Sequence, residues 1–205
     1  MKHAIKPSAK NVIALTTIGS TSVLALLAST VSAQALELYA GASMGVASGD
    51  VPSPGSTSYP EDYSLSGLVL GGFVGAKTTL GNGMMVGVEH ALTGPTEGDP
   101  DGNSSYDYAY DVNWTLDSKL RVGTSIGNIA VYGFAGLSHG SANIYWKEYS
   151  FSGTNIGLGA EMPLGNDMTI GIEAIQRNLA GYGSSSNDAS NQVSRAISVR
   201  ASFDF

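Results

Sequence analysis

The chain of 205 residues contains no cysteine. A disulfide framework, a thiolate metal site and a lipidated N-terminal cysteine are therefore excluded. Charged residues are scarce, at 13%, and 10 Lys and Arg are outnumbered by 17 Asp and Glu. Because nucleic-acid phosphates are bound by basic side chains, this balance argues against a nucleic-acid partner. Glycine is abundant, with 27 residues, and this favours short strands and tight turns over a helical domain.

The N-terminal segment has the character of a secretory signal peptide. Lysines at 2, 6 and 10 form a basic start, residues 11–31 are largely apolar, and small residues offer a cleavage site after Ala33 or Ala35. The alternative is a retained anchor helix, although polar residues between 16 and 22 weaken the segment as a membrane span. Its removal changes the formal charge from −7 to −10, since seven basic residues then face 17 acidic ones. We predict a signal peptide at 1–35 and one domain at 36–205.

The C-terminal segment alternates strictly enough to predict a strand. Odd positions carry Val193, Ile197, Val199, Ala201, Phe203 and Phe205, and even positions carry Ser194, Ser198, Arg200, Ser202 and Asp204. Such a strand has one apolar and one polar face. Because the final residue is an aromatic on the apolar face, the pattern suits a closed barrel without a free edge. An apolar outside around a charged inside is favoured by lipid.

About eight strand-like segments follow the predicted signal peptide. The clearest is the fourth, in which apolar residues from Tyr110 to Val122 alternate with polar residues from Asp111 to Arg121. The segments cover 36–47, 64–80, 84–93, 110–122, 129–138, 152–164, 168–177 and 193–205.

The connections between these segments alternate between short and long. Three are tight turns built on Gly and Asn, around Asn82, Gly127 and Asn166. Four are longer, at 48–63, 94–107, 139–151 and 180–191. Short periplasmic turns and long outer loops are typical of membrane barrels, and an even number of strands leaves both ends of the domain on the periplasmic side.

Several motifs, taken in order, resemble the small eight-stranded outer-membrane β-barrel proteins of Gram-negative bacteria, the porin family or outer-membrane protein β-barrel domain. The resemblance covers residues 36–205. The motifs are Lys119-Leu-Arg121-Val-Gly123, Val131-Tyr-Gly-Phe-Ala-Gly136-Leu, Ile156-Gly-Leu-Gly-Ala-Glu161, Ile170-Gly-Ile-Glu173 and Arg200-Ala-Ser-Phe203-Asp-Phe205.

The resemblance implies an all-β, antiparallel, up-and-down transmembrane barrel in the outer membrane. It also implies export through the inner membrane, help from periplasmic chaperones, insertion by the barrel-assembly machinery, and contact with outer-membrane lipid and lipopolysaccharide. That machinery reads a C-terminal aromatic residue, a role that Phe205 fits. The Pro-rich first loop and the acidic second loop depart from the common family pattern, and loops carry individual functions.

Charged residues on the inward parity predict an ion-pair network in the lumen. An eight-stranded barrel is about wide enough for side chains only, and charges there must pair or hold water. The candidate network is Glu89, Asp117, Lys119, Arg121, Glu161, Glu173 and Arg200. The alternation also places Glu37, Asp111 and Arg177 on the inward face. A polar path for small solutes and a pair of catalytic carboxylates are the alternatives.

Other candidate sites have weaker patterns. Oxygen ligands alternate along the acidic loop from Glu97 to Asp107, but the EF-hand spacing is absent, which favours a solvated loop over a calcium site. His90 and His139 fall near the inferred outer ends of strands without a Ser nucleophile motif, which favours interfacial histidines over catalysis. Aromatics near strand ends, including Phe151, predict interfacial girdles, with ligand binding by loop aromatics as the alternative.

The sequence therefore predicts an integral outer-membrane β-barrel protein with a structural or surface-exposed role. We expect no enzyme activity, no cofactor and no resident metal. The alternatives are a narrow porin-like diffusion channel and a loop-based adhesin or binding protein for an extracellular ligand. A soluble lipocalin-like barrel would need an apolar inside, and the inward acids and arginines argue against it.

Overall fold

The computed structural model describes residues 36–51, 63–81, 83–97, 110–144, 147–165, 167–182 and 189–205. The predicted signal peptide at 1–35 lies outside these residues. The described part of the chain forms nine β-strands: β1 (Glu37–Val51), β2 (Tyr63–Thr79), β3 (Met84–Thr93), β4 (Thr96–Glu97), β5 (Tyr110–Ile126), β6 (Ile129–Ile144), β7 (Lys147–Pro163), β8 (Met168–Tyr182) and β9 (Ala189–Asp204). Among the described residues, no helix is long and apolar enough to cross a membrane.

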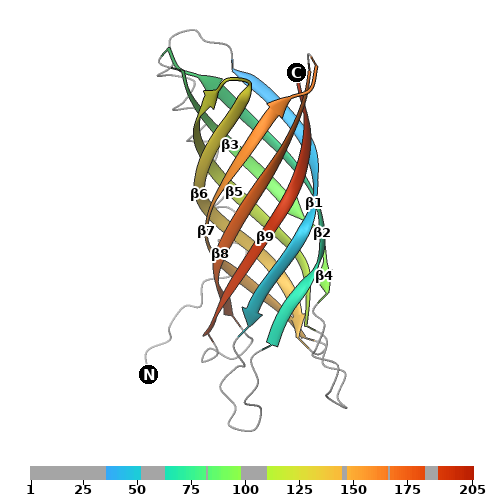
Figure 1. Cartoon of the computed structure of the whole chain (residues 1–205). Helices are drawn as coiled ribbons and strands as arrows, with labels where there is room; N and C mark the ends of the chain where they lie inside the picture. Colours follow the sequence, from blue (N-terminus) through green and yellow to red (C-terminus); the bar gives the residue numbers. More distant parts are fainter. Residues whose placement is uncertain are drawn as a thin grey trace, which may run out of the picture.

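The strands close into one antiparallel barrel (Figure 1). Their order is β3-β2-β1-β9-β8-β7-β6-β5-β4, and β3 also pairs with β5, so the sheet returns to its own first strand. The two-residue β4 continues β3 beyond Gly94 and Pro95 and pairs with β5 in the same register. The barrel thus has eight long strands, as predicted.

The three short turns lie at one end of the barrel, together with the start of β1 and the end of β9 (Figure 1). The turns depend on glycines with positive φ, which few other residues adopt: Gly83 at 81°, Gly127 at 64° and Gly165 at 93°. The backbone N–H of Phe205 donates to the carbonyl of Leu38 at 2.9 Å, so pairing between β9 and β1 continues to the last residue. We refer to this end as the turn end.

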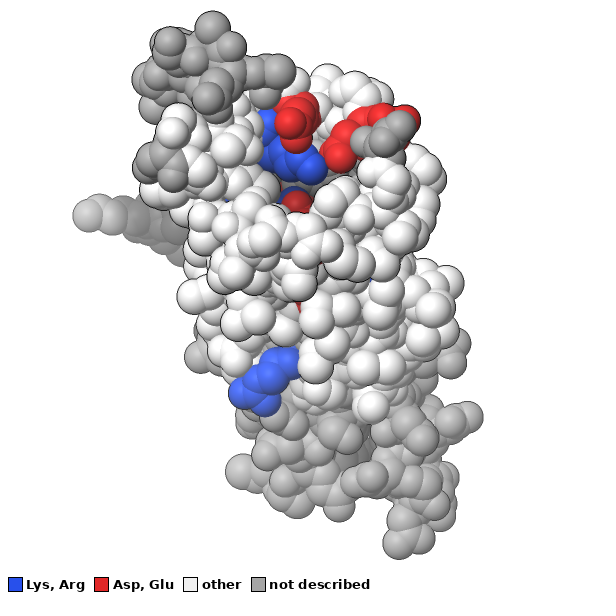
Figure 2. Space-filling model, turned by 45° about the horizontal axis from the view of Figure 1, so that its top comes forward, with Lys and Arg blue, Asp and Glu red and all other residues white. Residues whose placement is uncertain are grey.

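A belt of apolar side chains surrounds the barrel from the turn end upward. On β1 the belt covers 38–46, and on β9 it covers 197–205, with exposed fractions of 62% for Val46 and 63% for Ile197. About 9–11 residues of tilted strand cross the hydrocarbon of a bilayer. Figure 2 shows this wall almost free of charged groups, which gather instead at the barrel opening of the turn end.

Five of the eight long strands, β1, β6, β7, β8 and β9, extend four or more residues past their predicted ends, away from the turn end. At the turn end, β5 also continues past its predicted end, from Val122 to Ile126. The predicted loop at 139–151 is largely strand, since β6 continues to Ile144 and β7 begins at Lys147. Likewise, β8 continues to Tyr182 and β9 begins at Ala189. The strands are 15–17 residues long apart from β3 and β4, so the barrel stands well above the belt.

The predicted alternation of the fourth segment is wrong at its outer end. A register shift between Val112 and Trp114 in the pairing with β6 marks a β-bulge. Because of this extra residue, Val112 is buried inside the barrel rather than facing outward with Trp114. The interruption of β3 at Gly94 and Pro95 lies opposite this bulge, since Thr93 pairs with Thr115 and Thr96 with Val112.

The outward side chains change from apolar to polar above the belt. Examples are Ser48, Ser66, Thr154, Asn178 and Arg195. The inward side chains there are mixed: buried polar residues such as Thr115, Asn155 and Ser194 alternate with the buried apolar residues Ala47, Val69, Val112, Ala142, Phe151, Ile175, Leu179 and Ala196. We call this part of the barrel, which is polar outside and mixed inside, the outer extension.

Inward glycines make room for inward aromatic rings on the neighbouring strands. Tyr39 pairs with Gly75 and its ring covers the place where a Cβ would lie, and Phe134 covers Gly157 in the same way. The other pairs are Phe73 over Gly41, Tyr132 over Gly159 and Phe151 over Gly140. Phe151 is expected in an interfacial girdle. Its side chain instead points into the lumen, where it is 3% exposed.

Candidate functional site

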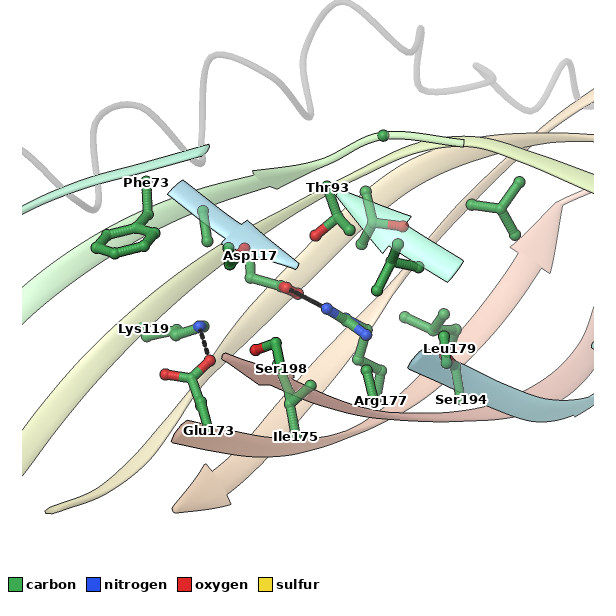
Figure 3. A pocket seen from close by; sticks show the side chains of 18 of the residues that line it. Phe73, Thr93, Asp117, Lys119, Glu173, Ile175, Arg177, Leu179, Ser194 and Ser198 are labelled. Carbon is green, nitrogen blue, oxygen red and sulfur yellow. Dashed lines mark hydrogen bonds and ion pairs between the residues drawn. The ribbon is translucent and has the colours of Figure 1, made fainter. Parts of the chain in front are cut away.

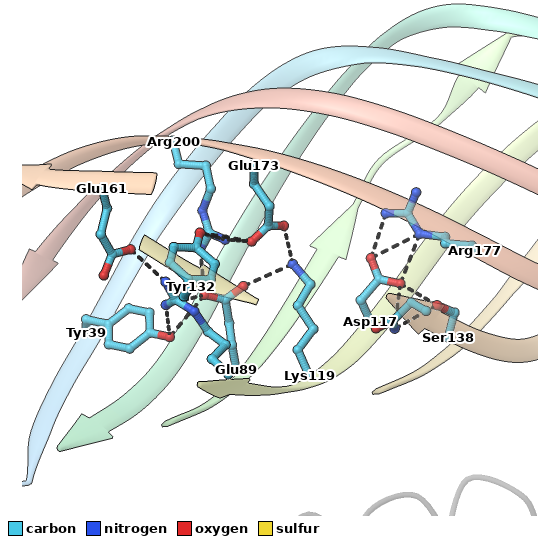
Figure 4. Close-up of polar contacts among 12 residues, drawn as sticks. Tyr39, Glu89, Asp117, Lys119, Tyr132, Ser138, Glu161, Glu173, Arg177 and Arg200 are labelled. Atoms are coloured by element: carbon cyan, nitrogen blue, oxygen red, sulfur yellow. Dashed lines mark hydrogen bonds and ion pairs between the residues drawn. The ribbon is translucent and has the colours of Figure 1, made fainter. Parts of the chain in front are cut away.

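Glu89 of β3 is the centre of a charge cluster inside the barrel (Figure 4). Its side chain has no exposed surface, and its carboxylate accepts hydrogen bonds from four side chains on three other strands. The donors are Tyr39 at 3.0 Å, Lys119 at 3.1 Å, Arg121 at 3.2 Å and Arg200 at 2.5 Å. Burying an unpaired carboxylate costs several kcal/mol, and these four donors compensate for that cost.

Glu173 of β8 binds two of the same cations from across the lumen. Lys119 Nζ lies 2.5 Å from Glu173 Oε1, and Arg200 Nη1 donates to Glu173 Oε2. Tyr132 Oη donates to the same Oε2 at 3.2 Å. Lys119 and Arg200 thus each join Glu89 to Glu173, and these contacts connect β3, β5, β8 and β9 through the middle of the barrel.

Two arginines of the cluster also stack on aromatic rings. The guanidinium carbon of Arg121 lies 3.8 Å from the centroid of the Tyr132 ring, and that of Arg200 lies 3.9 Å from the centroid of Phe73. Arg121 Nη2 also donates to Glu161 Oε2 of β7 at 2.7 Å. A cation over an aromatic face gains up to about 2 kcal/mol when desolvated. Each of the eight long strands therefore contributes a side chain to the cluster.

A second pair of charges lies further from the turn end. Arg177 of β8 donates from Nε and Nη2 to Asp117 of β5, at 3.0 Å to Oδ1 and 2.6 Å to Oδ2. Ser138 donates to the same carboxylate at 2.6 Å, and Asn155 donates to the Ser138 hydroxyl at 3.0 Å. The fork of the guanidinium on the carboxylate is the geometry of a strong, directional ion pair.

All seven side chains of the candidate network lie in the lumen and take part in these two groups: Glu89, Asp117, Lys119, Arg121, Glu161, Glu173 and Arg200. Arg177, which the sequence pattern also places inward, completes them through its pair with Asp117. Four carboxylates then face four cations, so the described lumen charges balance.

Two other residues predicted on the inward parity lie elsewhere. Glu37 is half exposed at the turn end, 3.8 Å from Lys77, which also lies 3.0 Å from Asp204. The side chain of Asp111 lies outside the described part of the structure. Lys77 thus joins the first and last strands at the mouth of the barrel, while Phe205 beyond it is 78% exposed.

The two candidate histidines lie on different neighbours of β5. His90 Nδ1 is 3.0 Å from Ser118 Oγ on the outward parity of β3 and β5. His139 on β6 packs edge-on against Trp114, with ring centroids 5.6 Å apart. The sequence pattern does not predict Ser118 as the partner of His90, although the alternation places both side chains on the outward face. The acidic loop beyond Glu97 lies outside the described residues.

The space left in the lumen is small and divided. On the turn side of the cluster, a cavity of about 10 Å³ is lined by residues including Tyr39, Arg121 and Thr169. On the other side, a cavity of about 50 Å³ reaches from Arg200 and Glu173 up into the outer extension, past Ile175 and Leu179 (Figure 3). The first has room for about one water molecule.

Comparisons with known proteins agree with this geometry. A family model described as outer membrane protein beta-barrel domain matches residues 21–205. Among curated protein sequences, none matches the chain. The structure of Neisserial surface protein A (NspA) is similar with a TM-score of 0.53 and 11% identity, covering 84% of this chain and 100% of that one, which concerns the fold alone.

Two further solved structures are less similar. The Ail attachment invasion locus protein of Yersinia pestis gives a TM-score of 0.46 at 16% identity, covering 82% of this chain and 99% of that one. The outer membrane protease OmpT from Escherichia coli gives 0.41 at 10% identity, covering 82% and 97%.

Proposed function

Because the chain belongs to the family of outer membrane protein β-barrel domains, we propose that it is a structural, surface-exposed protein whose lumen is closed to solutes. The chain is a bacterial outer-membrane β-barrel protein, and the apolar belt anchors it in lipid. Within the barrel, the charge network holds opposite strands together. The outer extension raises the outer ends of the strands above the membrane surface.

The observation that carries this proposal is the crossing of the lumen by buried ion pairs. Lys119 and Arg200 each connect carboxylates on two different strands, and Arg177 is joined to Asp117 above them. A solute would have to separate these pairs, and exposing a buried unpaired charge costs several kcal/mol. The closed lumen therefore favours a structural role over the narrow diffusion channel.

The same network supports a role without catalysis. A general acid or base needs a carboxylate that is free to exchange a proton with a substrate. Glu89 and Glu173 each accept from three or more donors, and Asp117 is held by a guanidinium and a hydroxyl. These carboxylates are held by fixed partners and are not open to a substrate.

Conductance in planar bilayers tests the closed lumen. We expect purified, refolded protein to give no discrete conductance steps, while an open porin inserted into the same bilayers gives them. Insertion is checked by the shift in gel mobility between boiled and unboiled samples. Discrete steps in the unaltered protein that change size with Arg121→Ala or Glu161→Ala would establish the diffusion channel instead.

A loop-based binding role is the second candidate, because the outer extension provides a rigid support for the loops. Strands of 15–17 residues have about 50 Å of length along their axes, of which the belt uses about 30 Å. Replacement of residues 98–109 or 52–62 by short Gly-Ser turns should then remove adhesion of whole cells to a host-cell monolayer while gel mobility shows a folded barrel. Unchanged adhesion, or adhesion no greater than that of cells without the protein, counts against this role.

For assembly, we propose that Phe205 is read by the barrel-assembly machinery after periplasmic chaperones deliver the chain. Its exposure at the turn end and its place at the end of β9 support this. Lipopolysaccharide and outer-membrane lipid are the partners of the belt. Export by a signal peptide at 1–35 is part of the same proposal, and N-terminal sequencing of the mature protein tests whether cleavage follows Ala33 or Ala35.

A further inference from the structure

Arg195 of β9 differs in its partners from the other cations whose side chains the structure describes. Those cations each form an ion pair in the lumen or at its mouth: Lys77, Lys119, Arg121, Arg177 and Arg200. Arg195 is exposed on the outside of the barrel, one outward position above Ile197 at the upper edge of the belt. Among the described side chains, no carboxylate lies within ion-pair distance of it. Figure 2 shows a basic patch on the side wall, apart from the charged groups at the turn end. The charge of Arg195 is therefore available to an anion at the membrane surface.

Neighbouring side chains orient the guanidinium of Arg195. Its Nε donates to Oε1 of Gln176, the cross-strand partner on β8, at 3.1 Å. The amide of Gln176 in turn donates to Oδ1 of Asn178 at 3.4 Å. On the other side, the cross-strand partner on β1 is Ser48, which is exposed and carries a hydroxyl group. Because Gln176 holds the guanidinium through Nε, the fork formed by its two Nη groups is left for the oxygens of a phosphate.

The lipid-facing wall contains an open groove of about 770 Å³ whose exposed surface is almost wholly apolar. Its floor is low because small residues stand there: Gly133, Ala160 and Ala174. A Cβ at Gly133 would have no atom nearer than 3.7 Å, so this glycine leaves open space instead of receiving a neighbouring side chain. The rims are large, exposed side chains: Leu158 at 66%, Ile172 at 59% and Ile197 at 63%. The volume lies within the roughly 300–1,000 Å³ of ligand sites.

The groove slants across the membrane. It follows a row of cross-strand partners on five neighbouring strands: Ile197, Ala174, Leu158, Gly133 and Val122. Continued around the barrel, this row leaves β2 at Leu68 and returns to it at Thr78, ten residues nearer the turn end. The groove therefore descends from Ile197 toward the turn end. Four strand spacings of about 4.8 Å give a length of about 19 Å, and a tilt of about 45° makes this a descent of about 13 Å, nearly the roughly 15 Å of one leaflet.

The upper end of the groove lies directly below Arg195. Ala174 pairs with Ile197, and Gln176 pairs with Arg195 two residues further along the same two strands, which is about 7 Å of strand. From this juxtaposition we infer that the outer wall of β6–β9 is a binding site for one phosphorylated lipid of the outer leaflet, whose phosphate binds Arg195 and one of whose acyl chains lies in the groove. The groove by itself accepts the acyl chain of any lipid, and the unpaired guanidinium selects an anionic phosphate. The site rests on the proposed function, because it specifies the lipid partner of the belt.

NMR of the full barrel in phosphatidylcholine nanodiscs tests the site with dimyristoyl phosphatidic acid as the probe. Dimyristoylglycerol, which has the same chains and no phosphate, is the matched control lipid. We expect phosphatidic acid to give saturable shifts of the Arg195 Nε–H signal and of the Ile197 and Leu158 methyl signals, and the diacylglycerol to give no saturable shift at Arg195. Leu92 is the internal reference, because it is 53% exposed on the lipid face of β3, outside the groove. Equal responses of Leu92 and Ile197, or equal effects of both lipids, would show general exchange of belt lipid and overturn the inference.

Variants at Arg195 separate a site from general surface charge. Arg195→Gln should raise the phosphatidic acid content needed for half-saturation about tenfold, as the loss of charge-assisted hydrogen bonds predicts. Adding Ser66→Arg to this variant restores the net charge at an exposed position of β2, two strands away, and should not restore binding. An Ile197 response that returns with Ser66→Arg would show general attraction of anionic lipid to the barrel and overturn the inference.

Variants in the groove test the place of the acyl chain. Gly133→Leu fills the floor and should reduce the shift at Leu158, whereas Ala135→Leu, on the same face of β6 but outside the groove, should leave it unchanged. Gel mobility checks that each variant folds, and equal effects of the two count against the site. Shifts that follow the number of barrels per nanodisc would show a second copy in the groove and also overturn the inference. Failure of the site leaves the closed lumen untouched, because conductance measures that property separately.

Discussion

Arg177 and Asp117 meet through a forked ion pair although they stand on β8 and β5, which are separated in the barrel by β7 and β6. The pair therefore crosses the lumen rather than following the wall. The pair thereby fixes the distance between two strands that share no backbone hydrogen bond. The hydrogen bonds between neighbouring strands do not fix this distance by themselves.

Breaking this pair should destabilise the barrel strongly. Asp117→Asn keeps the shape of the side chain but leaves a buried guanidinium without its counter-charge, which costs about 3–5 kcal/mol. Unfolding by urea in detergent, followed by tryptophan fluorescence, measures the loss. The double variant Asp117→Leu with Arg177→Met should recover most of it, since an apolar pair has no charge to compensate. An Asp117→Asn barrel as stable as the unaltered protein would show that the pair adds nothing.

The aromatic rings that lie over inward glycines predict a selective intolerance to alanine. Gly157→Ala places a Cβ 2.2 Å from the carbonyl oxygen of Ala174 and 2.3 Å from the ring of Phe134, and should cost about 1–3 kcal/mol through overpacking. Gly133→Ala is the matched control on the neighbouring strand, because the nearest atom to its Cβ is 3.7 Å away. Urea unfolding compares the two variants. Equal stabilities would mean that the Phe134 ring and the β8 backbone at Ala174 both move aside at little cost.

Arginine substitutions should map the edge of the lipid belt. Ile172→Arg, within the belt, should cost about 2–4 kcal/mol, whereas Gln176→Arg two outward positions higher should cost about 0–1 kcal/mol. The difference arises because only the lower position removes a charge from water. Folding into lipid vesicles, followed by gel mobility over a urea series, gives both values. If the two variants are equally destabilised, the belt extends above Gln176.

Removal of Phe205 should affect assembly more than stability. We expect a severalfold lower amount of barrel in the outer membrane of cells, measured by fractionation and gel mobility, because the assembly machinery loses its C-terminal aromatic. Refolding of the same variant into detergent should be nearly unchanged, since Phe205 is mostly exposed. Phe203→Ala, on the same face of β9, is the control for lost apolar area. Equal losses in cells for both variants would argue against a terminal recognition signal.

Most of the barrel could be predicted from the sequence because lipid and lumen impose opposite demands on alternate residues. Parity alone separates Ile172 from Glu173 and Leu120 from Arg121, and glycines with neighbouring Asn or Asp mark the turns. Partner choice could not be predicted in this way. That Lys119 joins Glu89 to Glu173 depends on which strands face one another across the closed barrel, which no local pattern contains.

The outer ends of the strands were harder to predict, also for a physical reason. Above the belt several inward residues are apolar, so that Phe151 and Ile175 interrupt the alternation of outward apolar and inward polar residues that identifies a membrane strand. The bulge at Asn113 then moves Val112 to the inside without a neighbouring Gly or Pro on β5 to mark it. Arg177 could have been included in the network, since it has the parity of Glu173.

The change of the outward side chains from apolar to polar above the belt has a consequence for the depth of the barrel in the membrane. A shift of the barrel by two residues toward the periplasm would draw Arg195 and Gln176 into hydrocarbon, and a shift the other way would place Val46 and Ile197 in water. Both movements cost free energy, since the first buries polar groups in lipid and the second exposes apolar groups to water. The outward residues of the wall therefore fix how deeply the barrel sits in the membrane. The outer ends of the strands are consequently held at one height above the lipid.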